Sequence, residues 1–191
     1  MAFYRFCVIQ AAYLCLRRSR NAGTDGRINM KKAYFAGGCF WCITPAFKKI
    51  AGVAEVISGY SGGDAADAVY EKVKRQETFH RETICVEYDP QKVTFSELVN
   101  EFFARVDPFD GEGQFIDRGR SYTLAVYCND AGEEKMVTEK IAETEKKYGK
   151  KVFVALEKFT GFYPAEEYHQ DYYIKNPEAF EEELVSSGRK K

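Results

Sequence analysis

The sequence predicts an α+β protein with a ferredoxin-like split β-α-β fold, a two-layer sandwich with additional elements at its C-terminal end. The main observation is the order of its segments, in which strand, helix, strand, strand, helix and strand patterns follow one another. A further helix and a short strand come after this core. A second observation is the length of 191 residues, which suits one domain with a proper hydrophobic core, or one domain plus an extension.

Each element is predicted from its own local pattern. Strands are expected where apolar and polar residues alternate, or where a short apolar run is bounded by turn residues. Helices are expected where apolar residues recur with helical period after a start signal. In chain order we predict a strand at 32–36, a helix from Cys39 to about Ile50, a strand at 53–58, an irregular segment with a helical turn near Tyr70, a strand at 82–88, a helix that opens at Thr94 and closes at Asp107, a loop through Gly119, a strand at 121–128, a helix at 133–148 and a strand at 152–156.

Turn and capping residues mark the ends of these elements. Gly52 ends the first helix, and the glycine-bearing segment 60–64 breaks the second strand. Pro90 terminates the third strand, since proline cannot continue a sheet ladder. Thr94 and Glu97 have the spacing of a capping box, in which each residue satisfies the backbone of the other. The positions of these turn and capping residues therefore agree with the element ends predicted from the hydrophobic periodicity.

The overall charge and hydropathy exclude several classes of function. The 28 basic and 29 acidic residues nearly cancel, so the sequence does not indicate binding to a nucleic acid or a membrane surface. No apolar stretch approaches the length of a transmembrane helix. We therefore expect a cytoplasmic protein, acting as a monomer, without a membrane or nucleic-acid partner.

The two ends of the chain differ from its middle. Residues 1–29 contain an apolar run followed by clustered arginines, where a signal peptide would have a small-residue cleavage site. We interpret them as a poorly ordered extension that the natural product need not contain, because Met30 is a plausible start; a short membrane anchor is the alternative. The predicted domain covers residues 30–180, and residues 181–191 are expected to form a charged tail.

The segment Gly37-Gly38-Cys39-Phe40-Trp41-Cys42 carries the clearest chemical signal. If a helix begins near Cys39, its free N–H groups and dipole favour the thiolate, which is the nucleophilic form. The spacing places Cys42 on the same helical face, close enough to capture an oxidised Cys39. Phe40 and Trp41 can supply an apolar contact surface. The motif predicts redox chemistry at sulfur, with a structural disulfide or half of a zinc site as alternatives.

The other cysteines weaken the zinc alternative. A closed zinc site needs four ligands, whereas the remaining cysteines stand singly and the two histidines are far apart in sequence. Cys85 and Cys128 lie in strand-like runs, where a buried cysteine usually acts as a small hydrophobe. We therefore expect neither a metal nor a cofactor. The residues concerned are Cys7, Cys15, Cys85, Cys128, His80 and His169.

A series of short motifs between Met30 and about Phe180 carries a family resemblance. In chain order these motifs are Gly38-Cys39-Phe40-Trp41, Gly59-Tyr60-Ser61-Gly62-Gly63, Tyr70 with Val73, His80-Arg81-Glu82 with the strand up to Pro90, Asp107-Pro108, Asp117-Arg118-Gly119, Tyr122, and Tyr168-His169-Gln170-Asp171-Tyr172. The series resembles the type A peptide methionine sulfoxide reductases. The resemblance covers about four fifths of the chain, and the order of so many motifs makes it specific.

The resemblance implies reduction of the S epimer of methionine sulfoxide, in proteins and free. It assigns attack on the sulfoxide sulfur to Cys39 and proton donation to Glu82, kept protonated by a desolvated setting. The hydroxyl groups of Tyr70 and Tyr122 would hold the sulfoxide oxygen. The family places Asp117 near the resolving chemistry and the tyrosines. Phe40 and Trp41 would receive the methyl group of the substrate.

The departures from the family pattern concern recycling and the rim of the pocket. Many members carry glycine at the position of Cys42 and keep recycling cysteines near the C-terminus, but no cysteine follows Cys128 here. The resemblance to a Cys-Phe-Trp-Cys subgroup therefore implies that Cys42 forms a disulfide with Cys39, which thioredoxin reduces. Phe79 and Arg81 replace the usual glycine and alanine, and the segment 119–124 also differs.

Other interpretations stay open from the residues alone. A general dithiol oxidoreductase would need the two cysteines but neither Glu82 nor the tyrosines. A non-enzymatic module that binds a metal or a partner through its two cysteines is a further alternative. As isolated residues, Glu82 could be a strand-entry charge, Tyr70 and Tyr122 core residues, and Asp117 a turn residue. We expect His80 and His169 to form structural hydrogen bonds rather than to act in catalysis.

Overall fold

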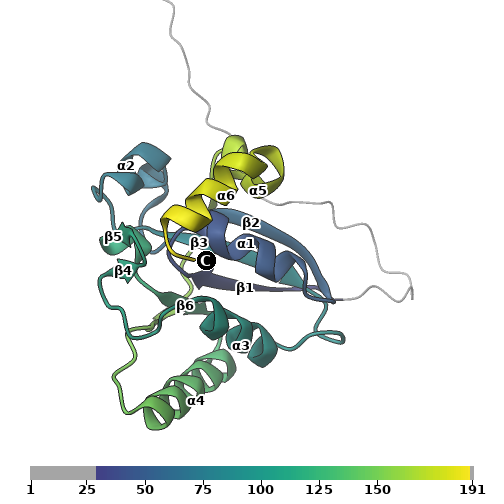
Figure 1. Ribbon diagram of the computed structural model, residues 1–191. Coiled ribbons are helices and arrows are strands. Elements are labelled where there is room, and N and C mark those ends of the chain that lie inside the picture. Colours follow the sequence, from purple (N-terminus) through teal and green to yellow (C-terminus); the bar gives the residue numbers. More distant parts are fainter. Residues whose placement is uncertain (1–28, 190–191) are drawn as a thin grey trace, which may run out of the picture.

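The computed structural model describes residues 29–189, which form a mixed six-stranded sheet with helices packed on it (Figure 1). The strand order is β7-β6-β1-β3-β2-β8, and only the pair of β6 and β7 is parallel. The central four strands, β6-β1-β3-β2, have the antiparallel order of a split β-α-β fold. This confirms the predicted fold class. The strands are β1 (Lys31–Ala36), β2 (Val53–Ser61), β3 (Arg81–Tyr88), β6 (Ala125–Cys128), β7 (Ala155–Lys158) and β8 (Tyr163–Pro164).

Two helices connect the strands of this core and cover one face of the sheet. Helix α1 (Phe40–Lys48) follows β1, and α3 (Phe95–Arg105) follows β3 (Figure 1). The predicted capping box is present, since Glu97 N–H donates to Thr94 Oγ1 at 3.2 Å and Thr94 N–H donates to Glu97 Oε2 at 2.7 Å. Phe35 of β1 packs beneath both helices, because its ring centroid lies 5.3 Å from those of Phe47 and Phe102.

The long helix α4 (Ala131–Tyr148) connects β6 to β7, and these two strands pair in parallel. Its first turn is capped by Asp130 Oδ1, which accepts from the N–H groups of Gly132 and Glu133. Gly149 ends the helix in the left-handed conformation, with φ of +64°.

The second face of the sheet is covered by the segment 159–162, which lies between β7 and β8 and has no regular secondary structure. Phe159 stacks on Tyr34 with ring centroids 3.9 Å apart, and Phe162 packs beside them. Cys85 belongs to this second apolar cluster, whereas Cys128 belongs to the main core on the helix side. The two strand cysteines are therefore buried on opposite faces.

Several short elements were not predicted, and two predicted strands are shifted. The strand expected at 121–128 begins only at Ala125, because residues 120–122 form a 3-10 turn that the Gln76 side chain holds through Ser121 N–H at 2.9 Å. The strand expected at 152–156 lies at Ala155–Lys158. The helical turn expected near Tyr70 is present as α2 (Tyr70–Lys74). Other elements of two to four residues lack enough periodicity to be recognised. They include η1 (Ala65–Asp67), β4 (Gly113–Gln114), β5 (Asp117–Arg118), η2 (Arg120–Tyr122), η3 (Glu167–His169) and α5 (Tyr172–Lys175).

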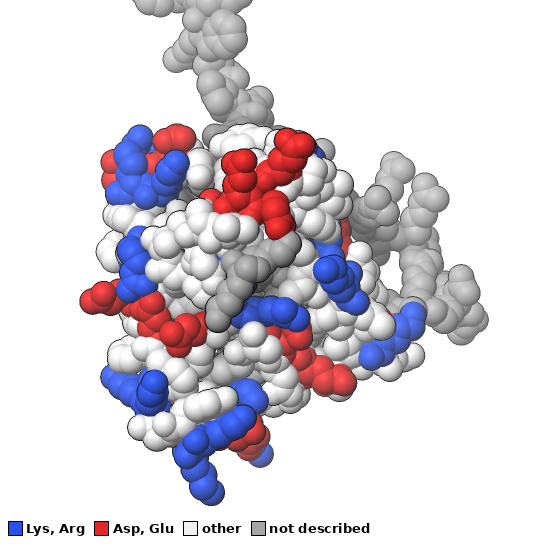
Figure 2. Space-filling view, viewed as in Figure 1, with Lys and Arg blue, Asp and Glu red and all other residues white. Residues whose placement is uncertain are grey.

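The C-terminal region folds back over the helix side of the sheet. Helix α6 (Pro177–Ser186) includes residues 181–186, so the first half of the expected charged tail is helical. Figure 2 shows acidic and basic side chains mixed over this face, with acidic side chains gathered near α6. No helix within residues 29–189 is long and apolar enough to cross a lipid bilayer. Cys7, Cys15 and nearly all of the expected N-terminal extension lie outside the described residues.

Candidate active site

Cys39 occupies the N-cap position of α1, at the point where β1 ends. Gly37 and Gly38 form the turn between them, and Gly38 has φ of +79°. A Cβ atom added at Gly38 would lie only 2.7 Å from the Cβ of Gln114, so a side chain at this position would push the β4–β5 hairpin away. The glycine therefore allows the hairpin to pack directly against the start of α1.

Glu82 reaches the same helix start from β3. Strand β3 pairs with β1 in a register that sets Phe35 opposite Ile84, so Glu82 lies level with the turn that follows β1. The Glu82 side chain is 3% exposed, and its Oε2 accepts a hydrogen bond from Phe40 N–H at 3.0 Å. Burial raises the pKa of this carboxyl group to about 8, against the opposing effect of the Phe40 N–H. The group is therefore mostly protonated at neutral pH.

Cys39 and Cys42, called here the dithiol, are unpaired and lie in contact. Their hydrogen bond, burial and the nearby acids Glu82 and Asp117 raise the pKa of the Cys39 thiol well above its usual value. The expectation that the helix start favours the Cys39 thiolate is therefore wrong for this state. The physical reason is the hydrogen bond with Cys42 together with burial, since Cys39 is only 6% exposed.

The two tyrosines and Asp117 come from three different short elements. Tyr70 is the first residue of α2, Tyr122 ends η2, and Asp117 begins β5. Burial raises the pKa of both tyrosine hydroxyl groups, and the charges of Glu82 and Cys39 add to both shifts. Asp117 acts electrostatically on Cys39, Glu82 and Tyr122. The fold thus brings all of these predicted residues to one place.

The aromatic residues of the motif differ in their exposure. Phe40 is 1% exposed and lies beneath the site, whereas Trp41 is half-buried and stacks on Tyr172 with ring centroids 3.8 Å apart. His169 packs between these rings and Tyr70, whose centroid is 4.2 Å away. Within residues 29–189 neither ring nitrogen of His169 has a hydrogen-bond partner, so its expected hydrogen-bonding role is wrong. His80 does form one, between Nε2 and the Asp64 carbonyl oxygen at 2.9 Å.

Three residues of the site were not recognised from the sequence. Glu166 Oε1 accepts from Tyr70 N–H at 3.0 Å and its Oε2 from the Tyr60 hydroxyl group at 2.9 Å, so it fixes the start of α2. Gln114 is fully buried against Gly38. Arg189 donates from Nη2 to Asp117 Oδ2 at 2.9 Å. Glu166 and Arg189 contact residues that are distant in the sequence, and no local sequence pattern marks any of the three as part of the site.

The other described cysteines lie away from Cys39. Cys85 is on the far face of the sheet, in the cluster around Tyr34. Cys128 follows Tyr127, which pairs with Tyr34, so it is level with Ala33, roughly 10 Å along β1 from the end of that strand. A disulfide needs Cα atoms within about 7 Å of each other. Neither residue can therefore pair with Cys39 in this fold.

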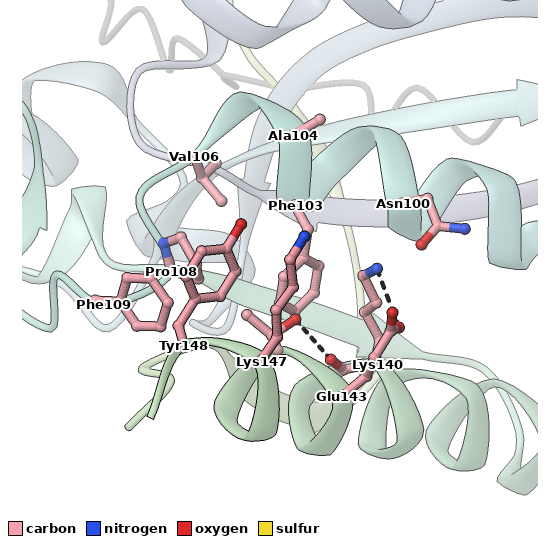
Figure 3. Close-up of a pocket in the computed structure, with 11 residues that line it drawn as sticks. Asn100, Phe103, Ala104, Val106, Pro108, Phe109, Lys140, Glu143, Lys147 and Tyr148 are labelled. Atoms are coloured by element: carbon pink, nitrogen blue, oxygen red, sulfur yellow. Dashed lines mark hydrogen bonds and ion pairs between the residues drawn. The ribbon is translucent and has the colours of Figure 1, made fainter. Parts of the chain in front are cut away.

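A separate hollow of about 370 Å³ lies between α3 and α4 (Figure 3). Phe103, Phe109 and Tyr148 line it, and Lys140 and Glu143, both on α4, form an ion pair at its α4 side at 3.3 Å. None of the residues predicted to act on a substrate belongs to its lining. Over residues 29–189, no group of three or more His, Cys, Asp or Glu residues could hold a metal ion.

Sequence and structure comparisons relate this chain to known proteins. A family model described as "Peptide methionine sulfoxide reductase" matches residues 31–191. MsrA 2 of Staphylococcus aureus strain MRSA252 is 39% identical over 165 residues, covering 84% of this chain and 93% of that protein. The structure of reduced Mxr1 from Saccharomyces cerevisiae covers 78% of this chain and 87% of its own, with a TM-score of 0.74 and 29% identity. Methionine sulfoxide reductase A of Corynebacterium diphtheriae covers 80% of this chain and 77% of its own, with a TM-score of 0.70 and 27% identity. This chain belongs to the peptide methionine sulfoxide reductase family, a family of oxidoreductases that reduce methionine sulfoxide.

Proposed function

We propose that the enzyme reduces the S epimer of methionine sulfoxide, in proteins and free, with Cys39 as nucleophile and Glu82 as proton donor. The observation that carries this proposal is the buried Glu82 carboxyl group beside Cys39, which has a pKa of about 8. A sulfoxide sulfur becomes electrophilic when its oxygen is protonated or strongly hydrogen-bonded. A protonated carboxyl group held at the start of α1 supplies that hydrogen.

The first half of the cycle consists of two proton transfers and the transfer of one oxygen atom. Glu82 donates its proton to the sulfoxide oxygen, and the Cys39 thiol gives its own proton to the carboxylate that results. The Cys39 sulfur attacks the sulfoxide sulfur, and the oxygen passes to Cys39 as methionine leaves. Cys39 becomes a sulfenic acid, and Glu82 ends protonated as it began. This order needs no preformed thiolate, which suits the raised pKa of the Cys39 thiol.

The surrounding residues would hold the substrate. The hydroxyl groups of Tyr70 and Tyr122 stay protonated at neutral pH, because burial raises their pKa, and can donate to the sulfoxide oxygen. The methyl group would lie against Trp41, with the buried Phe40 ring beneath it. Asp117 is proposed to assist the resolving step near Cys42.

Cys42 is proposed to complete the cycle. Its thiol attacks the Cys39 sulfenic acid, forming a disulfide and releasing water. Cys85 is a poor partner because it lies on the opposite face of the sheet, and Cys128 because it lies too far along β1. A dithiol protein of the thioredoxin type would then reduce the disulfide, and the complex of Mxr1 with Trx2 supports this choice. We place the monomeric enzyme in the cytoplasm, because regeneration by thiols needs a reducing compartment.

A turnover assay with each sulfoxide epimer tests the substrate. With dithiothreitol as reductant, the S epimer should be reduced and the R epimer should persist. Separate chromatography of the two epimers of a methionine sulfoxide peptide measures both at once. Reduction of both epimers at equal rates would contradict the proposed geometry.

The variant Cys42→Ser tests the second half of the cycle. It should form one equivalent of methionine at a nearly normal rate and accumulate a sulfenic acid at Cys39. Thioredoxin-driven turnover should collapse, while a small thiol can still attack Cys39 directly. The matched control is Cys128→Ser, which should turn over normally. Normal thioredoxin-driven turnover by Cys42→Ser would show that another cysteine resolves the sulfenic acid.

A further inference from the structure

The C-terminal segment Ser187–Arg189 brings the Arg189 side chain beside Gly38 and the dithiol, although it is more than 140 residues away in the sequence. In Figure 1, α6 runs in front of α1 and leads the chain toward the end of β1. We propose that this segment is a cover over the dithiol, latched by the ion pair between Arg189 and Asp117, and that substrate displaces it. The last clause rests on the proposed function, whereas the cover and its latch do not.

Arg189 is the contact that closes the segment onto the β4–β5 hairpin. Its Nη2 donates to Asp117 Oδ2 at 2.9 Å and lies 3.4 Å from the Gln114 carbonyl oxygen. Its guanidinium group stands over the Phe115 ring, 4.5 Å from the centroid. The side chains of Arg189 and Asp117 are only 10% and 17% exposed. The guanidinium group is therefore seated in the hairpin rather than extended into solvent.

The same guanidinium group reaches the residue that precedes Cys39. A Cβ atom placed on Gly38 would lie 3.6 Å from Arg189 Nη2. The charges of Cys42 and Cys39 both act on Arg189, which agrees with a position directly beside the dithiol. Cys39 is only 6% exposed, so little of its surface is open to a methionine sulfoxide side chain. A wider opening of the wall around Cys39 would let such a side chain approach.

The C-terminal segment follows a helix that is less buried than the core elements carrying Cys39 and Glu82. Cys39 and Glu82 sit on β1, α1 and β3, whose residues form the main core. By contrast, no residue of α6 is fully buried. The Nη1 of Arg189 is buried without a hydrogen-bond partner among residues 29–189, which weakens the closed arrangement. Elements with few buried contacts open locally more readily than core elements.

The rate at which iodoacetamide alkylates Cys39 in the reduced protein tests the latch. Mass spectrometry of the peptide that contains Cys39 measures this rate in wild type and in Arg189→Ala. Removing the latch should speed alkylation roughly fivefold, the factor that an ion pair of about 1 kcal/mol represents. Loss of a nearby cation by itself would disfavour the Cys39 thiolate and slow the reaction, so a faster rate can come only from opening.

Two further variants fix the interpretation. Arg189→Lys keeps a cation beside Asp117 and should stay close to the wild-type rate. Arg105→Ala removes an exposed arginine of α3 that pairs with Glu101, and it should leave the rate unchanged. A rate in Arg189→Ala that is equal to wild type, or slower, would overturn the latch. Alkylation needs no sulfoxide reduction, so this result stands whether or not the proposed chemistry is correct.

Displacement by substrate is tested separately in Cys39→Ser, which cannot react. Hydrogen exchange of residues 183–189 is measured by mass spectrometry with and without a peptide that contains methionine sulfoxide. We expect faster exchange in the complex, because the segment leaves the site when the peptide enters. Unchanged or slower exchange at saturating peptide would overturn the displacement. The same peptide with methionine in place of its sulfoxide serves as the control for non-specific binding.

Discussion

Two neighbouring residues of β3, Arg81 and Glu82, are both buried and yet behave in opposite ways. They are 5% and 3% exposed, and their side chains point to opposite faces of the sheet. Arg81 donates to Thr123 Oγ1 at 2.8 Å, to the Tyr127 hydroxyl oxygen at 3.1 Å and to Glu157 Oε1 at 2.8 Å. Among residues 29–189, Glu82 accepts a single hydrogen bond, from Phe40 N–H.

The difference shows that the partners of a buried group, rather than its burial, decide its protonation. Burial disfavours the charge of Arg81, but Tyr127 and Glu157 outweigh it and leave its pKa raised. The hydrogen bond from Phe40 N–H compensates only partly for the burial of Glu82, so the pKa of Glu82 rises to about 8. One strand therefore carries a structural cation on one face and a neutral acid beside the dithiol on the other.

The largest expected effect on activity comes from comparing two cysteines, one on the Glu82 face of the sheet and one on the Arg81 face. Cys39→Ser should abolish methionine formation, because a hydroxyl group is far less nucleophilic toward sulfur than a thiol. Cys85→Ser changes a cysteine on the Arg81 face and should keep most of the single-turnover rate. Rapid quench with detection of methionine measures both variants. Substantial activity in Cys39→Ser would end the proposed mechanism.

Replacing Arg81 should lower stability without changing the chemistry. Arg81→Met leaves the buried Tyr127 hydroxyl group and the Glu157 carboxylate without their donor, and we expect a loss of about 2–3 kcal/mol in the free energy of unfolding. Urea denaturation measures this loss, and Arg81→Lys should recover part of it. The single-turnover rate of the folded variant should match wild type. A large fall in that rate would erase the distinction between the two faces.

The effect of Glu82 on stability should appear as a pH dependence. Its pKa in the folded protein, about 8, is above its ordinary value of 4.5, so the folded state binds more protons over this range. Its contribution is therefore fully present below pH 4.5 and is lost as pH rises to about 8. Glu82→Gln cannot lose a proton, so it does not show this loss. As pH rises from 4.5 to about 8, its free energy of unfolding relative to wild type should therefore increase by roughly 1 kcal/mol per pH unit.

Chemical denaturation at pH 5, 6, 7 and 8 measures this difference, in a comparison that does not depend on catalysis. Glu87→Gln serves as the control, because Glu87 lies on the same strand with a more exposed side chain that pairs with Lys32. A constant difference between wild type and Glu82→Gln from pH 5 to pH 8 would show that Glu82 is ionised throughout.

The central fold could be predicted because its signals are local. The capping box at Thr94, the glycine at 149 and the alternation in the strands each act within a few residues. The 3-10 turn at 120–122 could not be predicted, because it is held by Gln76 from another part of the chain. The β4–β5 hairpin has only two residues in each strand and no detectable period.

For the site, the motifs predicted which residues take part, but not the contacts that these residues make. Nothing near Glu82 in the sequence shows that it accepts the Phe40 N–H. The motif also does not show how deeply Cys39 is buried, and this burial, with the hydrogen bond to Cys42, reverses the expected pKa shift of Cys39. Arg189 lies in a segment that looked like a solvated tail, and its role depends on a contact 72 residues away with Asp117. Contacts of this range follow from the topology rather than from local composition.

The most direct test of the account is the single-turnover rate of methionine formation in wild type and Glu82→Gln as a function of pH. The wild-type rate should fall as pH rises through about 8, where Glu82 loses its proton. Glu82→Gln should be slower at neutral pH by on the order of 10², the loss of a general acid, and should lack this step. Equal rates for the two proteins at pH 7 would contradict the assignment of Glu82 as the proton donor.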